Sequence, residues 1–513
     1  MGLKKGVFLL TLIIVLVIST VPASAAVTKN DRKWQDESIY YIMVDRFNDG
    51  DSRNAIDVDT KNPLSFNGGD FQGIIDKLDY IKDMGFTTIS LTPIFDNAKQ
   101  GYHGYWIQDY YKTDEHFGSM KMFQKLVQEA HKRQIKVMID FVANSVAPTH
   151  PWVQDPTKQG WFHPKQFNDT NQHLLENSWI GGQPDLNQEN PKVKKYLIDT
   201  AKWWIKQTDI DGYRLAAANY VPITFWSDFS KEIKAVKKDF YLLGDIQSDD
   251  PNVVTQYKNT GIDGFVDTNL NKDLRKGFAT TDLPLSSLFG DWEKDQQTIK
   301  NPYLMGTFMD DPQSTRFTQD IVANKQFPGS RWKMALTYLY TTPGIPVVFY
   351  GSEIALNGGN APDNHRQMSF RADKDLIDYL TKLGQLRKQL PSLTRGTFEK
   401  LYEKNGMVVY KRVYQTETAV IAINNTSKSQ HVTISSKQLE DGKELRGLLN
   451  GDVTKSTNNQ YNIILDRDNA EIYVLATKSG INVPLIASIT VVYAAFFVFL
   501  YFIFKRRKNK NQK

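Results

Sequence analysis

Eight short runs of β-branched, aromatic and other apolar residues, separated by longer helical patterns, most constrain what this chain can fold into. The runs are residues 39–44, 88–92, 136–141, 212–215, 241–244, 265–266, 307–309 and 347–349. Amphipathic stretches such as 71–84, 120–133 and 191–208 lie between them. Eight strand and helix units in this order predict a (β/α)8 TIM barrel, an α/β fold whose functional residues lie where strands end and loops begin.

Two regions interrupt this alternation. Residues 146–190 are too long for an ordinary loop and are rich in Trp, His, Pro and Asn, which predicts a small inserted domain after the third strand. From 396 to 477 the pattern changes to alternating strands, which predicts an antiparallel β domain. The expected barrel domain therefore spans 27–395, with the inserted domain within it.

The two ends of the chain carry apolar segments. Residues 1–26 combine two lysines, an apolar run and the small residues Ala23-Ser24-Ala25, as in a signal peptide. Residues 483–504 are 22 residues without a charge, and six Lys and Arg follow within 505–513. This predicts one transmembrane helix in the cell membrane, a cytoplasmic basic tail and a large extracellular N-terminal part. A buried core helix is the alternative interpretation of 483–504.

The charge and cysteine content exclude two classes of protein. The net charge of +6 comes from the lysines and arginines of the two ends, which have no acidic neighbours there. It therefore gives no support for nucleic-acid binding. With no cysteine, the chain has no disulfide framework.

Nine motifs follow the expected strands in order. They are IYYIMVDRFNDGD (39–51), GGDFQGI (68–74), GYHGYWIQDY (101–110), DFVANS (140–145), PDLNQENP (184–191), GYRLAAANY (212–220), LLGDI (242–246), TFMDDPQSTRF (307–317) and TTPGIPVVFYGSE (341–353). In this order the chain resembles the α-amylase superfamily, glycoside hydrolase family 13, over roughly residues 36–476. The resemblance implies a protein that handles α-glucans.

The resemblance locates three catalytic carboxylates, and this chain departs from the family at each position. A retaining glycosidase needs a nucleophile and an acid about 5–5.5 Å apart, and the family adds a third carboxylate that holds the distorted sugar. Ala216 occupies the position of the nucleophile, Asp245 replaces the glutamate acid, and Gln313 occupies the third position. Three family histidines are also replaced, by Ser145, Tyr220 and Pro312. The resemblance with these departures predicts a degenerate member.

Several residues that contact substrate in the family remain. They are Tyr102, His103, Trp106, Asp140, Arg214, Asp363 and Arg366. The alternative for the aromatic residues is packing at the barrel rim. For Arg214 and Asp140 the alternative is a structural ion pair inside the barrel mouth.

The resemblance also implies calcium at one or two sites. Asp49, Asp51, Asn54, Gly68 and Asp70 match an N-terminal calcium loop, although Ala55 departs from that loop's usual Asn. Asn144, Asp185 and the carbonyl group of Tyr220 match a central site between the inserted domain and the barrel. Oxygen ligands of this kind suit a hard cation, and the alternative is ordinary Asp/Asn turns.

Three functions are compatible with these observations. The first is a surface pseudoenzyme that binds α-glucans or related saccharides without cleaving them. The second is an active hydrolase with rearranged carboxylates, in which Asp245 is the acid and Asp310 or Asp311 activates water. The third is an extracellular scaffold for a membrane partner, which is an analogy at the level of the fold.

Overall fold

The computed structural model describes residues 31–165, 176–246, 248, 250, 252–478 and 483–510. Eight parallel strands form one sheet in the order β8-β7-β6-β5-β2-β1-β10-β9. They are β1 (Ile39–Ile42), β2 (Thr88–Leu91), β5 (Lys136–Val142), β6 (Gly212–Ala216), β7 (Tyr241–Gly244), β8 (Gly264–Phe265), β9 (Gly306–Phe308) and β10 (Ile345–Phe349). A bridge between Val266 and Gly306 joins the two outer strands and nearly closes the barrel. The predicted barrel is confirmed, with a strand at each of the eight predicted runs.

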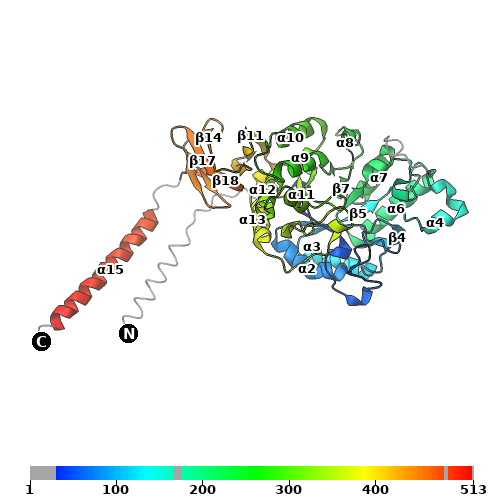
Figure 1. Cartoon of the computed structure of the whole chain (residues 1–513), viewed down its shortest axis with the longest axis horizontal. Coiled ribbons are helices and arrows are strands. Elements are labelled where there is room, and N and C mark those ends of the chain that lie inside the picture. Colours follow the sequence, from blue (N-terminus) through cyan, green and yellow to red (C-terminus); the bar gives the residue numbers. More distant parts are fainter. Residues whose placement is uncertain are drawn as a thin grey trace.

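Helices lie around the barrel and in the segments that leave it (Figure 1). They are α2 (Phe71–Asp83), α3 (Met120–Lys132), α4 (Pro151–Gln154), α6 (Pro191–Thr208), α7 (Ile223–Val236), α8 (Val253–Gln256), α9 (Thr268–Phe278), α10 (Ser287–Thr298), α11 (Phe317–Ala323), α12 (Pro328–Thr341), α13 (Asp375–Gln389) and α14 (Pro391–Arg395). Several begin at a side-chain cap, as where Asp70 accepts the N–H of Gly73 and Ser119 accepts that of Met122. Such caps satisfy donors that have no partner within the helix.

The barrel strands are buried along almost their whole length. Every residue of β1, β2, β6, β7 and β10 is buried. A parallel sheet covered on both faces favours apolar side chains. The charged residues inside β5 and β6, Asp140 and Arg214, therefore need partners within the barrel.

Two segments extend from the barrel, one after β2 and one after β5. The hairpin of β3 (Phe95–Asn97) and β4 (Ile107–Thr113) follows β2. The segment after β5 contains α4 and a 3-10 turn at Pro156–Trp161, and a bridge between Ser145 and Asp185 ties its ends together. Part of the predicted inserted domain, 166–175, lies outside the described residues.

An antiparallel β domain follows the barrel, as predicted. Its six-stranded sheet has the order β11-β12-β13-β18-β15-β16, and β14 pairs with β17. The strands are β11 (Thr397–Lys404), β12 (Met407–Tyr414), β13 (Glu417–Asn424), β14 (Gln430–Ser435), β15 (Lys443–Gly447), β16 (Val453–Lys455), β17 (Gln460–Leu465) and β18 (Asn469–Thr477). Buried residues of this sheet, such as Tyr410 and Ile472, belong to the same hydrophobic core as the barrel.

The prediction of a transmembrane helix at 483–504, and with it a single-pass location in the cell membrane, is wrong. Among the described residues, no helix combines the length and the apolar character that crossing a membrane requires. Residues 483–504 do form a helix, within α15 (Val483–Lys510). The predicted signal peptide, 1–26, lies outside the described residues.

Candidate functional site

Arg214 lies in the middle of β6 and is the charged centre of the barrel mouth. Its Nη1 donates to the hydroxyl of Tyr41 at 3.0 Å and to Oδ2 of Asp140 at 2.9 Å. Its Nη2 donates to Oδ2 of Asp245 at 2.7 Å. Arg214 and both aspartates are buried. The structure therefore brings three of the predicted site residues together, one from each of three neighbouring strands or strand ends.

Asp140 accepts hydrogen bonds from two tyrosines in addition to Arg214, and the sequence analysis did not predict these two bonds. The hydroxyls of Tyr41 and Tyr105 donate to its Oδ2 at 2.6 and 2.7 Å. Burial raises the pKa of Asp140, and the Arg214 cation and the two hydroxyls oppose that shift. Both tyrosines lie in motifs named above. No sequence pattern indicates that their hydroxyl groups bond to Asp140, because the partners are 99 and 35 positions apart in the chain.

Ala216 is the last residue of β6, two positions after Arg214. Ala216 is buried and its side chain is a methyl group, so the end of β6 brings no carboxylate to the barrel mouth. The chain then turns at Ala217, which has a positive φ of 48°, into a short 3-10 turn, Ala218–Tyr220. The substitution noted in the sequence thus lies at the expected place in the barrel.

Two neighbouring aspartates in the segment after β9, Asp310 and Asp311, have different surroundings. Asp310 is buried and accepts the N–H of Phe317 at 2.7 Å and the hydroxyl of Ser352 at 3.0 Å. The guanidinium groups of Arg275 and Arg316 each lie 3.7 Å from its carboxylate. Asp310 is therefore enclosed by structural partners and is not available to a substrate.

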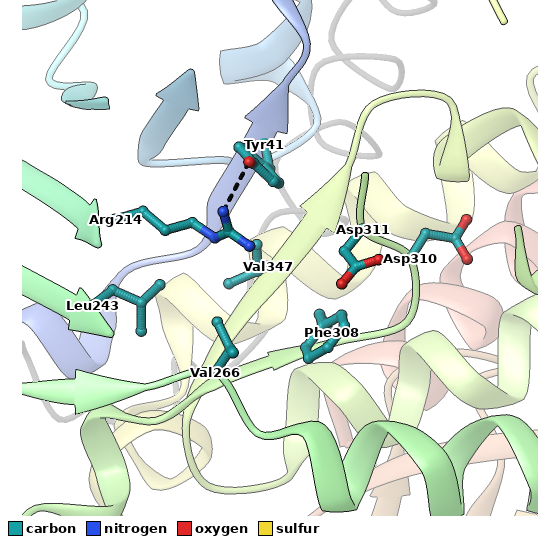
Figure 2. A pocket seen from close by; sticks show the side chains of 8 residues that line it. All are labelled: Tyr41, Arg214, Leu243, Val266, Phe308, Asp310, Asp311 and Val347. Atoms are coloured by element: carbon teal, nitrogen blue, oxygen red, sulfur yellow. Dashed lines mark hydrogen bonds between the residues drawn. The ribbon is translucent and has the colours of Figure 1, made fainter. Parts of the chain in front are cut away.

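Asp311, by contrast, lines a small hollow in the barrel mouth together with Asp310, Tyr41, Arg214 and four apolar side chains (Figure 2). The hollow has a volume of about 20 Å³, enough for one water molecule. Oδ1 of Asp311 accepts the N–H groups of Gln313 and Ser314 at 3.1 and 2.7 Å. Gln313 itself is exposed. The carboxylate that this loop offers to the hollow is thus Asp311.

The predicted sugar-contacting aromatic residues form a second cluster on the hairpin between β3 and β4. Tyr102 is buried, with the guanidinium of Arg46 4.0 Å from its ring centre and its hydroxyl 3.0 Å from Nδ1 of His365. His103 packs edge to face on Trp106, and burial lowers the pKa of His103 to about 3. His365 also lies 2.7 Å from the carbonyl oxygen of Pro312, so it connects Tyr102 to the loop of Asp311.

Asp363 and Arg366 do not join these clusters through any described hydrogen bond. Nε of Arg366 donates to Oδ1 of Asp363 at 2.8 Å, and both side chains are about half exposed. Asp363 also accepts the N–H of Gly359 at 2.6 Å. The pair stabilises its own loop after β10.

The central calcium set converges in the structure. One end of the Asn144 amide lies 2.8 Å from the carbonyl oxygen of Tyr220 and 2.8 Å from Oδ1 of Asp185. As an NH2 group this end donates to both oxygens, and as an oxygen it completes a group of three oxygens suited to calcium. Burial raises the pKa of Asp185 to about 7, and His163 Nδ1 lies 2.6 Å from its other oxygen. The donor set fits a cation.

The N-terminal calcium set, Asp49, Asp51, Asn54, Gly68 and Asp70, is held mainly by its own hydrogen bonds. Asp70 accepts the N–H groups of Gly50, Asp51 and Gly73, and Asp51 accepts two N–H groups of Arg53 at 2.7 Å. Oδ1 of Asn54 is buried without a hydrogen-bond partner among the described residues, which fits a cation ligand. Neither set has three or more His, Cys, Asp or Glu side chains grouped for a metal, and the rest of the described chain has no such group either.

Family models match both folded parts of the chain. The model described as the α-amylase catalytic domain matches residues 41–379, and the α-amylase C-terminal domain matches 396–473. Among curated relatives, the β/α-amylase of Paenibacillus polymyxa is 32% identical over 85% of this chain. The match spans only 38% of that relative's own length.

Two solved structures are similar at higher identity. The α-amylase of Anoxybacillus is 56% identical with a TM-score of 0.87, and the α-amylase of Geobacillus thermoleovorans, solved in complex with acarbose, is 54% identical with a TM-score of 0.85. Each match covers 88% of this chain and the whole of the solved one. The fold, the order of motifs and these matches agree, and the chain belongs to the α-amylase family.

Proposed function

We propose that the chain binds α-glucans at the barrel mouth and hydrolyses them with a rearranged pair of carboxylates, Asp245 and Asp311. The observation that carries this proposal is that Asp311 lines the same water-sized hollow as Arg214, whose guanidinium holds Asp245. The amylase names of the relatives, and the acarbose bound to one of them, support α-glucans as the substrate class.

The chemistry is an inverting hydrolysis. Asp311 accepts a proton from a water molecule as the water oxygen attacks the anomeric carbon, and Asp245 donates a proton to the departing glycosidic oxygen. Inverting enzymes place these carboxyl groups about 6.5–9.5 Å apart. Ala216 offers no nucleophile for a covalent intermediate, and Asp310 is excluded as the base because it is enclosed by its partners. Since Asp245 must carry the proton that it donates while Asp311 must be ionised to accept one, activity is expected to follow a bell-shaped pH profile.

A second candidate is glucan binding without hydrolysis. Ala216 favours it, because removing the nucleophile of a retaining glycosidase lowers turnover by about 10⁴-fold or more. Tyr102, Trp106 and Arg214 would then serve recognition alone.

One set of variants tests both candidates. Release of reducing sugar from maltooligosaccharides is measured for the parent chain, for Asp311→Asn and for the exposed control Asp373→Asn. The lead proposal expects slow hydrolysis that Asp311→Asn lowers at least about 100-fold and that Asp373→Asn leaves unchanged. If the parent binds maltooligosaccharides in calorimetry but releases no sugar, the second candidate holds. Activity that appears only in Ala216→Asp/Asp245→Glu/Gln313→Asp would support the second candidate and an intact binding cleft.

We also propose that calcium binds between Asn144, Asp185 and the carbonyl group of Tyr220, and a second calcium at the loop of Asn54 and Asp70. The fit of three converging oxygens supports the first site, and the unpartnered Asn54 oxygen supports the second. Bound calcium would offset the charge of the buried Asp185 and hold the inserted segment against the barrel.

Chelation tests the calcium proposal. Removal of calcium with EDTA is expected to lower the Tm of the parent, with recovery on addition of Ca²⁺. Asp185→Asn should bind less Ca²⁺ in calorimetry. A Tm that EDTA does not change would contradict both sites.

A further inference from the structure

A second hollow lies at the opposite end of the barrel from the candidate active site. Its wall includes Asp36, Thr87 and Gln134, which precede β1, β2 and β5 respectively. Parallel strands all begin at this face, whereas Arg214 and Asp311 lie toward their carboxyl ends. The hollow has a volume of about 270 Å³, so it is large enough for a small polar ligand.

Cations dominate the wall of this hollow. Four positively charged side chains line it, namely Arg32, Lys82, Arg133 and Lys388, against a single carboxylate, Asp36. The carboxylate is already engaged, because the Thr394 hydroxyl donates to it at 2.7 Å and Nε of Arg395 donates to it at 3.0 Å. Asp36 therefore does little to neutralise the lining cations.

The two arginines are compensated and held in place. Nε of Arg32 donates to Glu37 at 2.7 Å, and its other nitrogens donate to the carbonyl oxygens of Thr87 and Gln134 at 2.9 and 2.8 Å. Arg133 donates to Asp79 at 2.7 Å and to Glu129 at 2.9 Å. These contacts fix both guanidinium groups at the wall.

The two lysines carry the positive charge that remains. Lys82 lies in the last turn of α2 and Lys388 in the last turn of α13. Among the described residues, neither ammonium group forms an ion pair. Partial burial, followed by the charges of Arg32 and Lys82, lowers the pKa of Lys388, while the charges of Glu37 and Asp83 oppose that shift. The helix C-termini favour a cation at each position separately, but they do not explain two unpaired cations lining one hollow.

We propose that this hollow binds a phosphate dianion, with Lys82 and Lys388 as the ligands that supply the matching charge. Two ammonium groups without a direct ion pair match the two negative charges of phosphate, and the fixed guanidinium groups of Arg32 and Arg133 border the hollow beside them. The hollow is larger than inorganic phosphate, so it also has room for a phosphate group attached to a sugar. This site is independent of the proposed function at the barrel mouth.

Thermal unfolding and calorimetry of the full chain test the proposal at constant ionic strength. The probes are inorganic phosphate, a hexose phosphate and a short polyphosphate, which distinguish free from attached phosphate. At about 10 mM of the preferred probe, the Tm of the parent is expected to rise by about 2 °C or more. Lys82→Gln/Lys388→Gln is expected to lose this rise and to weaken binding at least about 10-fold in calorimetry.

A matched control removes the same charge elsewhere. Lys231→Gln/Lys276→Gln changes two exposed lysines on the outer helices α7 and α9, and it should keep the full response to the probe. No rise in Tm and no heat of binding for the parent with any probe would overturn the proposal. An equal loss of binding in the two double variants would also overturn it, since binding would then follow net charge alone.

Discussion

Arg214 illustrates, at the scale of a residue, how a strand of apolar residues tolerates a cation. Two carboxylates and one hydroxyl accept its N–H groups, so a full charge is buried without losing its hydrogen bonds. The same contacts leave Asp140 and Asp245 dependent on Arg214. Whatever its role toward a substrate, Arg214 is therefore part of the stability of the barrel.

Arg214→Met is expected to lower the free energy of unfolding by about 3–5 kcal/mol, because it leaves two buried carboxylates uncompensated. Urea denaturation measures the change. Arg366→Met is the matched control, because its ion pair with Asp363 is half exposed and should contribute less than about 1 kcal/mol. Equal effects of the two substitutions would contradict this account.

Helices α9 and α10 contact each other through two aspartates, Asp267 and Asp295, and the stability of this contact depends on their protonation. Asp267 caps α9 by accepting the N–H of Leu270 at 2.9 Å, and Asp295 of α10 hydrogen bonds with it. Burial, and then the charge of Asp267, raises the pKa of Asp295. The native state consequently holds a proton that the unfolded chain releases above about pH 4.

Stability from this contact should fall as the pH rises from about 4 toward the raised pKa of Asp295, because the unfolded state binds fewer protons in that window. Asp295→Asn removes the share of this dependence that Asp295 contributes, whereas Asp291, whose pKa burial also raises, keeps its own share. The free energy of unfolding of Asp295→Asn relative to the parent should therefore increase by about 1 kcal/mol or more between pH 5 and pH 8. Urea denaturation at both pH values measures this, and Glu293→Gln, exposed on the same helix, should show no such trend.

In the whole molecule, the barrel and the β domain are joined by hydrogen bonds of a buried arginine and by a shared hydrophobic core. Arg412 of β12 is buried, and it donates to the carbonyl oxygens of Gly396 and Thr397 at 3.1 and 3.0 Å and to that of Thr341 at the end of α12. Burial lowers the pKa of Arg412 to about 9. Its hydrogen bonds and the shared hydrophobic core link the two parts.

Arg412→Met should lower the free energy of unfolding by about 2–4 kcal/mol, because three carbonyl groups lose their donor inside the interface. Calorimetry should show the β domain beginning to unfold at a lower temperature than the barrel. Arg446→Met, in a partly exposed ion pair on β15, is expected to have little effect. A single unchanged transition for Arg412→Met would contradict the proposed link.

Features that depend on residues close together in the chain were predicted correctly from the sequence. Features that depend on contacts between distant segments were not. The eight barrel strands and the β domain were predicted because an apolar or alternating run is readable within a few residues. The membrane prediction rested on the apolar run 483–504 and the six cations after it, and it was wrong. Tyr105 and His365 were not assigned to the site, because their partners lie 35 and 263 positions away in the chain.

The amino-acid sequence was enough to predict the eight barrel strands in chain order, the position of the β domain and the location of Ala216 at the end of a strand. Each of these follows from residues close together in the chain. The hydrogen-bond partners that enclose the Asp310 carboxylate and leave Asp311 for the hollow, and the groups that neutralise Arg214, became known from the folded structure. Tyr41 is 173 positions from Arg214 in the chain, and no local pattern records a hydrogen bond that only barrel closure can form.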